Sequence, residues 1–168
     1  MNNKLLLDEI DSYRHHFDNN YVGGIPKLFN ETGIFLSFVT ILSAIEALAG
    51  LMAPNKPTGD RFISFIETYF PANYHSHASG LWKFRNTMIH SFSPGVYYLT
   101  CHTSRMHLKE VAEASILLNA EDFYGALLLS SNKYFDALLL DANLQANFRK
   151  RVADSDGGAP RTVSITRN

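Results

Sequence analysis

An arginine, an asparagine and a histidine lie close together near the middle of the chain, in the stretch Arg85-Asn86-Thr87-Met88-Ile89-His90. A histidine can donate or accept a proton near neutral pH, and an arginine can hold a phosphate through two N–H donors. Asn86 and His90 are four residues apart, so on a helix they share one side. Together these residue types indicate acid–base chemistry on a phosphate ester. A lone histidine at the C-terminal end of a helix would indicate only a favourable charge interaction with the helix dipole.

The position of Arg85 on its helix leaves two roles open. A helix is expected over residues 75–92, because apolar residues recur there at helical spacing and Pro94-Gly95 follows. At about 100° per residue, Arg85 falls at the centre of the apolar face of this helix. A guanidinium there must be paired with a carboxylate or must face an interface or a site. Glu46, the only charged residue within residues 33–53, is the expected partner.

The other residues that could do chemistry form weaker patterns. His75 and His77 are two residues apart, which on a helix does not converge on one metal ion. His102 and His107 could join them only if the chain folds back. We therefore predict no metal site and no cofactor. A Gly-rich phosphate loop and a Gly-x-Ser-x-Gly motif are also absent from the sequence.

Composition indicates one globular domain. The chain has 168 residues, of which 46% are hydrophobic and 18% charged. The formal net charge is −1, so any contact with a nucleic-acid backbone must be local. The single cysteine excludes a disulfide framework and suits a reducing compartment. No apolar run typical of a signal peptide precedes the acidic residues at positions 8–11. The predicted localisation is cytoplasmic.

Residues 33–53 form a long apolar segment that must be distinguished from a membrane span, which needs about 20 apolar residues. Glu46 lies well inside this segment, no basic flank adjoins it, and three hydroxyl side chains add polarity. These features favour a buried core helix, so we predict no association with a membrane.

The remaining pattern predicts an all-α fold, a bundle of about five helices with a small β-hairpin inserted before the last long helix. Helices are expected over residues 3–18, 33–53, 58–70, 75–92 and 119–152, and strands over residues 96–100 and 115–118. Asn119 is expected to cap the last helix. Residues 1–153 form the predicted domain, and residues 154–168 a flexible C-terminal tail.

The motif Arg85-Asn86-x-x-x-His90, late in a small helical bundle, resembles the Arg-x-x-x-x-His signature of HEPN domains, in which Asn commonly follows the Arg. The resemblance covers residues 30–150 and includes the apolar helix that carries Glu46. It implies a metal-independent endoribonuclease of the kind found in toxin, defence or stress systems. By this resemblance, His90 would serve acid–base chemistry, Arg85 would stabilise the phosphoryl charge and Asn86 would orient it.

The resemblance also leaves a second function open. Other HEPN domains have no activity and only pair with partner proteins, including nucleotidyltransferase-type antitoxins. The alternative is therefore a catalytically inactive HEPN-like interaction module. In the toxin branch a tyrosine often lies two residues after the histidine. Here Phe92 takes that place, so any regulation that modifies the tyrosine hydroxyl is not available at this position. Full pairing of Arg85 inside one chain, with His90 directed elsewhere, would decide for this alternative.

A geometric difficulty points to a dimer. Arg85 and His90 are five residues apart, which separates them by about 140° around an ideal helix. Either the helix unwinds near His90, or the site is shared between two chains. The low net charge favours the second route, because a two-fold axis would bring two copies of the motif into one cleft. We therefore predict a symmetric homodimer with the motif helix at or near its interface, and RNA as the substrate.

Overall fold

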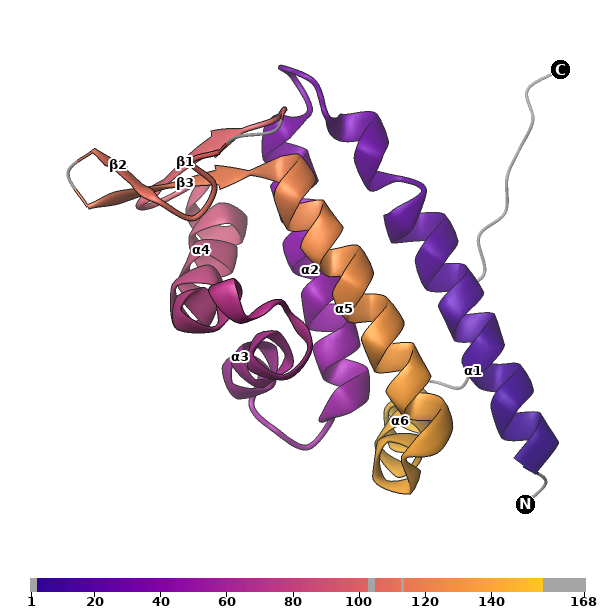
Figure 1. Ribbon diagram of the computed structural model, residues 1–168. Coiled ribbons are helices and arrows are strands. Elements are labelled where there is room, and N and C mark those ends of the chain that lie inside the picture. Colours follow the sequence, from indigo (N-terminus) through magenta and orange to yellow (C-terminus); the bar gives the residue numbers. More distant parts are fainter. Residues whose placement is uncertain (1–2, 103–104, 113, 156–168) are drawn as a thin grey trace, which may run out of the picture.

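The computed structural model describes residues 3–102, 105–112 and 114–155, and shows a bundle of helices with a small β-sheet at one end (Figure 1). The helices are α1 (Asn3–Phe17), α2 (Ile34–Met52), α3 (Thr58–Tyr69), α4 (Ala78–Ser91), α5 (Ala120–Leu140) and α6 (Ala142–Asp154). Shorter helical turns are η1 (Asp18–Val22), η2 (Ile25–Leu28) and η3 (Ala72–His77), and the strands are β1 (Tyr97–Thr100), β2 (Glu110–Ala112) and β3 (Ser115–Asn119). The predicted helical bundle with a small β insertion is confirmed.

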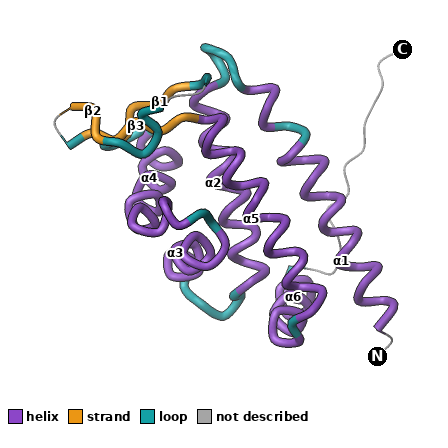
Figure 2. Tube along the Cα trace, in the orientation of Figure 1, coloured by secondary structure: helices purple, strands orange, loops and turns teal. Residues whose placement is uncertain are grey.

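Helix α2 is the central element, and α3, α4, α5 and α6 all pack on it (Figure 2). Its sequence is apolar on nearly every side, and nine of its residues are buried. Phe38, Ile41 and Ile45 are completely inaccessible to solvent. Within the described ranges, α2 is the one helix long and apolar enough to cross a membrane. Its burial among four other helices agrees with the predicted core helix.

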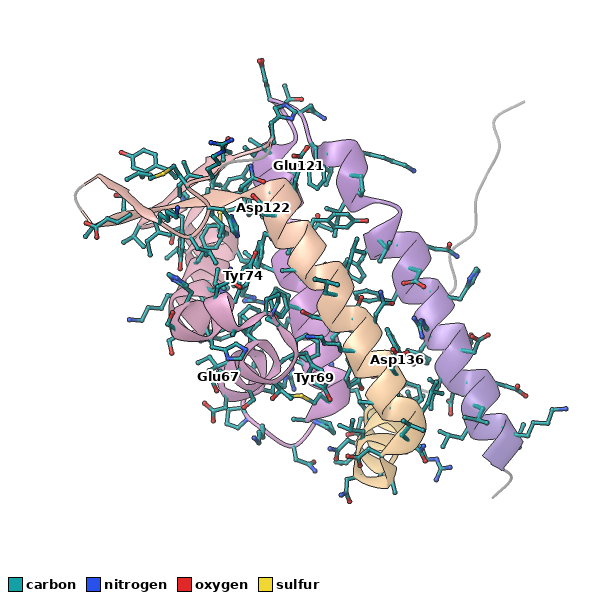
Figure 3. The ribbon with its side chains drawn as sticks, in the orientation of Figure 1. Glu67, Tyr69, Tyr74, Glu121, Asp122 and Asp136 are labelled. Carbon is teal, nitrogen blue, oxygen red and sulfur yellow. The ribbon has the colours of Figure 1, made fainter. Side chains whose placement is uncertain are left out.

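Two polar contacts attach the N-terminal segment to α5, one near each end of α5. Arg14 of α1 forms an ion pair with Asp136 of α5, at 3.4 Å between Nη1 and Oδ1 (Figure 3). The Tyr124 hydroxyl of α5 donates a hydrogen bond of 2.8 Å to the carbonyl of Val22, at the end of η1. Together these contacts hold α1 and η1 along the length of α5.

The sheet contains both predicted strands, but they pair differently from the prediction. The strand order is β1-β3-β2, with β1 parallel to β3 and β2 antiparallel to β3. The hairpin is therefore formed by β2 and β3, and β1 joins it in parallel. The chain between β1 and β3 includes β2 and is long enough for the connection that a parallel pair requires. Strand β2 was not predicted, because it is only three residues long and its pairing is interrupted by an irregularity.

The predicted last helix is divided at Asp141, so the prediction of one long helix over residues 119–152 was wrong. Asp141 has an extended backbone (φ −103°, ψ 114°), and its Oδ1 accepts the N–H groups of Asn143 and Leu144 at 2.7 and 3.2 Å. Aspartate is a strong N-cap, so it begins a new helix inside the expected one. Helix α6 extends to Asp154, and the part of the predicted tail at residues 156–168 lies outside the described residues.

The motif helix begins later than predicted. Residues 72–77 form the 3-10 turn η3, and α4 begins at Ala78. The predicted cap of α5 is confirmed, since the Asn119 side chain accepts the backbone N–H of Asp122 at 3.0 Å. The order of elements places the motif of α4 beside α2 and α3, and turns α6 back toward the same side of α2.

Candidate functional site

The predicted ion pair between Glu46 and Arg85 is present, with 2.6 Å between Oε2 and Nη2. The two side chains are 23% and 22% exposed, so the pair lies at the edge of the bundle rather than in the core. Arg85 Nη1 also donates a hydrogen bond of 3.2 Å to Asn86 Oδ1, and the guanidinium carbon lies 5.5 Å from the centre of the Trp82 ring. The charged hydrogen bond and the cation–π contact fix the guanidinium in one orientation.

An open cavity of about 270 Å³ adjoins this ion pair. We name it the arginine cavity; its lining residues are Ser43, Glu46, Ala47, Arg61, Arg85 and Arg151. Three guanidinium groups face one carboxylate there, so the cavity is positive although the whole chain has a formal charge of −1. The sequence analysis missed Arg61 and Arg151, because they come from α3 and α6, far from the motif along the chain.

A glycine on α3 makes room for a side chain beside this cavity, and a glycine on α2 marks where Arg151 lies. A Cβ atom at Gly59 of α3 would lie only 2.9 Å from Trp82 Nε1, so a larger residue would displace the ring that supports Arg85. On α2, a Cβ atom at Gly50 would lie 3.5 Å from Arg151 Nε, which places that guanidinium directly against the helix. Arg151 is brought there by α6, which is held to the end of α2 by a 2.8 Å hydrogen bond from Asn147 Nδ2 to the carbonyl of residue 52.

His90 does not join this cavity within one chain. It is exposed, lies in the last turn of α4, and is not among the lining residues. The helix continues through Ser91, and the left-handed residue that ends it is Phe92 (φ 51°, ψ 30°). The helix therefore does not unwind at His90, and the offset of about 140° from Arg85 is retained. Unwinding of the helix at His90, one of the two predicted routes to a joint site, is therefore not observed.

Exposed apolar side chains lie on both sides of His90 along the chain. Phe92 is 82% exposed, Val96 is 56% exposed, and Ile89 on the last turn of α4 is 39% exposed. Tyr98 of β1 is also exposed. We name these four residues the apolar surface. Two mostly apolar grooves share the segment 94–97 as part of their lining, so apolar surface is also exposed beside Val96.

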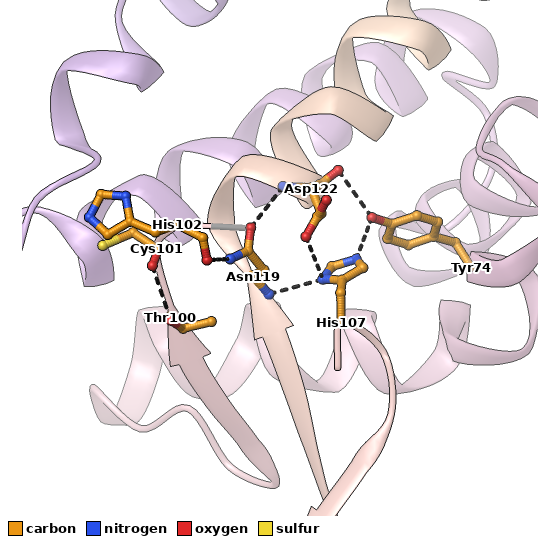
Figure 4. A network of polar contacts seen from close by, with 7 residues as sticks. All are labelled: Tyr74, Thr100, Cys101, His102, His107, Asn119 and Asp122. Atoms are coloured by element: carbon orange, nitrogen blue, oxygen red, sulfur yellow. Dashed lines mark hydrogen bonds and ion pairs between the residues drawn. The ribbon is translucent and has the colours of Figure 1, made fainter. Parts of the chain in front are cut away.

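A second polar cluster is built around His107 (Figure 4). Its Nδ1 accepts the backbone N–H of Asn119 at 3.0 Å, so the neutral ring carries its proton on Nε2. Nε2 lies 2.7 Å from the Tyr74 hydroxyl, which in turn donates to the carbonyl of Asp122 at 3.3 Å. Burial lowers the pKa of His107, more than the Asp122 carboxylate raises it. The cluster is enclosed, and it ties η3 and the sheet to the first turn of α5.

His75 and His102 contact different groups. His75 Nε2 is 3.0 Å from the carbonyl of Phe70, and His102 Nδ1 is 3.5 Å from Glu121 Oε1. In the part of the chain that the structure describes, no group of three or more His, Cys, Asp or Glu residues could hold a metal ion. The absence of a metal site stays a prediction.

Comparison of the chain with family models, with curated proteins and with solved structures found no match. Function is therefore inferred from the motif, the arginine cavity and the surface around His90.

Proposed function

We propose that this chain is a HEPN-like, metal-independent endoribonuclease that acts as a homodimer. The state of Arg85 carries this proposal. Glu46, Asn86 and Trp82 hold its guanidinium in place, yet 22% of the side chain remains exposed at an open cavity. An arginine that stabilises a phosphoryl group must be both fixed and accessible. His90 is exposed on the same helix, where it can transfer a proton.

The proposed reaction is a phosphoryl transfer within the RNA strand. The ribose 2′-oxygen attacks phosphorus and the bond to the 5′-oxygen breaks, which gives a 2′,3′-cyclic phosphate and a free 5′-hydroxyl. His90 either removes the proton from the 2′-hydroxyl, while water protonates the leaving 5′-oxygen, or protonates the leaving 5′-oxygen, while water accepts the proton of the 2′-hydroxyl. Arg85 stabilises the charge on the phosphoryl oxygens, and Asn86 orients Arg85. These steps are acid–base and electrostatic in kind, so the mechanism requires no metal ion.

Two features support a homodimer with α4 at its interface. Arg85 and His90 lie on different sides of a helix that stays intact, so a joint site needs a second chain. The exposed side chains of the apolar surface include Ile89 and Phe92, close to His90 along the chain, and around a two-fold axis they could be covered by the same residues of a second copy. Covering it would be favourable by about 25 cal/mol for each Å² of apolar area. Sedimentation should then give about twice the chain mass of 18.9 kDa.

One observation favours a second candidate, a catalytically inactive HEPN-like interaction module that pairs with a partner protein such as an antitoxin. Arg85 is already paired with Glu46 inside the chain, and His90 does not line the same cavity. In that case the apolar surface would bind the partner, and neither residue would act on RNA. Cleavage of RNA separates the two candidates.

The test is cleavage of single-stranded RNA by the purified protein in the presence of EDTA. The wild-type chain should cut, and His90→Ala should reduce the rate about 100-fold or more without changing the circular dichroism spectrum. His15→Ala is the matched control, because His15 is exposed on α1 and lies outside the motif. Cleavage that persists in His90→Ala, or that requires added metal, would overturn the proposal.

Mixed dimers test whether the site is shared. Arg85→Ala and His90→Ala chains should each be inactive alone. If each site takes Arg85 from one chain and His90 from the other, a mixed dimer contains one intact site. Random mixing should then restore about one quarter of the wild-type activity, since half of the dimers are mixed and each has one of two sites. A chain that cleaves RNA as a monomer would refute the shared site.

A further inference from the structure

A second, mostly apolar cavity of about 420 Å³ adjoins the arginine cavity. We name it the aromatic cavity; it lies among α1, η1, α2, α5 and α6. Its lining residues are Tyr13, His16, Phe17, Tyr21, Ala47, Leu48, Leu51, Phe135, Arg151, Val152 and Ser155. The rings of Phe17 and Tyr21 are 5.1 Å apart between centroids, so the aromatic wall continues from α1 into η1. A cavity of this size can take a planar ring system and a sugar.

The two cavities share Ala47 of α2 and Arg151 of α6 as lining residues. Their charges also reach across the boundary. Burial raises the pKa of Tyr21, and the Glu46 carboxylate of the arginine cavity raises it further. Burial also raises the pKa of Tyr13, and the positive charge of Arg151 partly offsets this rise. An aromatic site and a cationic site are therefore in contact, with Arg151 between them.

The arginine cavity has donors that the chain does not use. Three guanidinium groups and one carboxylate leave a net charge of about +2 there. Arg61 Nε is buried and has no hydrogen-bond partner among the described residues. Neither Arg61 nor Arg151 forms an ion pair with any carboxylate that the structure describes. The guanidinium groups of Arg61 and Arg151 therefore line the cavity without a carboxylate partner, and a phosphate offers several acceptor oxygens to them.

We propose that the two cavities together bind one nucleotide, with its phosphate against Arg61, Arg85 and Arg151 and its base in the aromatic cavity, beside Tyr13 and Tyr21. Nucleobases stack on aromatic side chains whatever their identity, so this site selects the nucleotide class rather than a sequence. The inference rests on the proposed function in one respect, since it takes the nucleotide to be part of the RNA substrate. Arg61 and Arg151 then become substrate-binding residues that the motif alone does not reveal.

Trp82 supplies the readout, because it is the only tryptophan of the chain and its ring lies 5.5 Å from the guanidinium carbon of Arg85. The full chain is titrated with adenosine monophosphate, with adenosine and with inorganic phosphate, and the fluorescence of Trp82 is followed. The monophosphate should bind at least about tenfold more tightly than either part alone, because it fills both cavities.

Variants assign the two halves of the site. Arg61→Gln and Arg151→Gln should each weaken binding of the monophosphate about tenfold. Lys150→Gln is the matched control, since it removes the same charge from the neighbouring, exposed position of α6 and should have no effect. Tyr21→Ala should weaken binding of the monophosphate while leaving that of inorganic phosphate unchanged. The unchanged phosphate affinity also shows that this variant is folded.

The outcomes separate this inference from the nuclease proposal. Equal affinities for the monophosphate and for inorganic phosphate, or an affinity that Arg61→Gln and Arg151→Gln leave intact, would overturn the nucleotide site. Nucleotide binding by a chain that cuts no RNA in EDTA would support this site and refute the nuclease. Cleavage by a chain that binds none of the three probes would support the nuclease and refute this site.

Discussion

Replacing Glu46 with glutamine would remove the only carboxylate of the arginine cavity while preserving the size of the side chain. Arg85 would then face Arg61 and Arg151 without the partner that now lies 2.6 Å away. An exposed ion pair contributes about 0–1 kcal/mol, and breaking a buried one costs about 3–5 kcal/mol. With side chains 22% and 23% exposed, this pair lies between those limits. After allowance for solvent screening, we expect a loss of about 1–3 kcal/mol of unfolding free energy.

Thermal unfolding followed by circular dichroism measures this loss. In a domain of this size, each kcal/mol corresponds to about 2–4 °C, so Glu46→Gln should lower the Tm by about 2–12 °C. Glu67→Gln is the matched control, because Glu67 is exposed on α3 (Figure 3) and should leave the Tm within about 1 °C of wild type. Phosphate should stabilise Glu46→Gln more than wild type at equal ionic strength, because an anion replaces the lost charge. A Tm equal to that of wild type would refute the reasoning.

Three further changes test the packing. Asp141→Ala should lower the unfolding free energy in urea by about 1 kcal/mol, because α6 loses its N-cap; no change would mean that the cap is dispensable. Tyr134→Phe should leave stability unchanged or raise it by about 1 kcal/mol, since its buried hydroxyl has no partner in the described chain; a loss would reveal a partner. Burial in the folded chain lowers the pKa of His107 below its ordinary value of 6.5, so as the pH falls the unfolded chain takes up a proton at a higher pH than the folded chain. Stability should therefore decline as the pH falls below about 6.5, and His107→Gln, unlike the exposed His15→Gln, should flatten the decline.

The helices could be predicted where one local signal dominates. The segment that became α2 is apolar on nearly all sides, which indicates a core helix, and Asn119 is a strong N-cap for α5. The break at Asp141 was missed because the leucines before it continue the apolar pattern of α5. The parallel pairing of β1 with β3 depends on how the connection between them folds, and no local pattern specifies that.

In the candidate site, too, the residues with a local signal could be predicted and those brought in by tertiary packing could not. The pair of Glu46 and Arg85 could be predicted, because each is a charge on an otherwise apolar helix face. Arg61 and Arg151 could not, because they meet Arg85 only when α3 and α6 pack against α2. Gly50 gives no signal either, because a Cβ there would be in ordinary contact with Arg151 Nε at 3.5 Å and the position does not require glycine.

The nature of the RNA ends tests the central claim most directly. Single-stranded RNA is incubated with the wild-type chain in EDTA, and the products are identified by mass spectrometry. Attack by the 2′-oxygen, assisted by Arg85 and His90, predicts 2′,3′-cyclic phosphate and 5′-hydroxyl ends, and no cut where the 2′-hydroxyl is replaced by hydrogen. Ends that carry a 5′-phosphate, cleavage beside a 2′-deoxynucleotide, or intact RNA under these conditions would contradict the account.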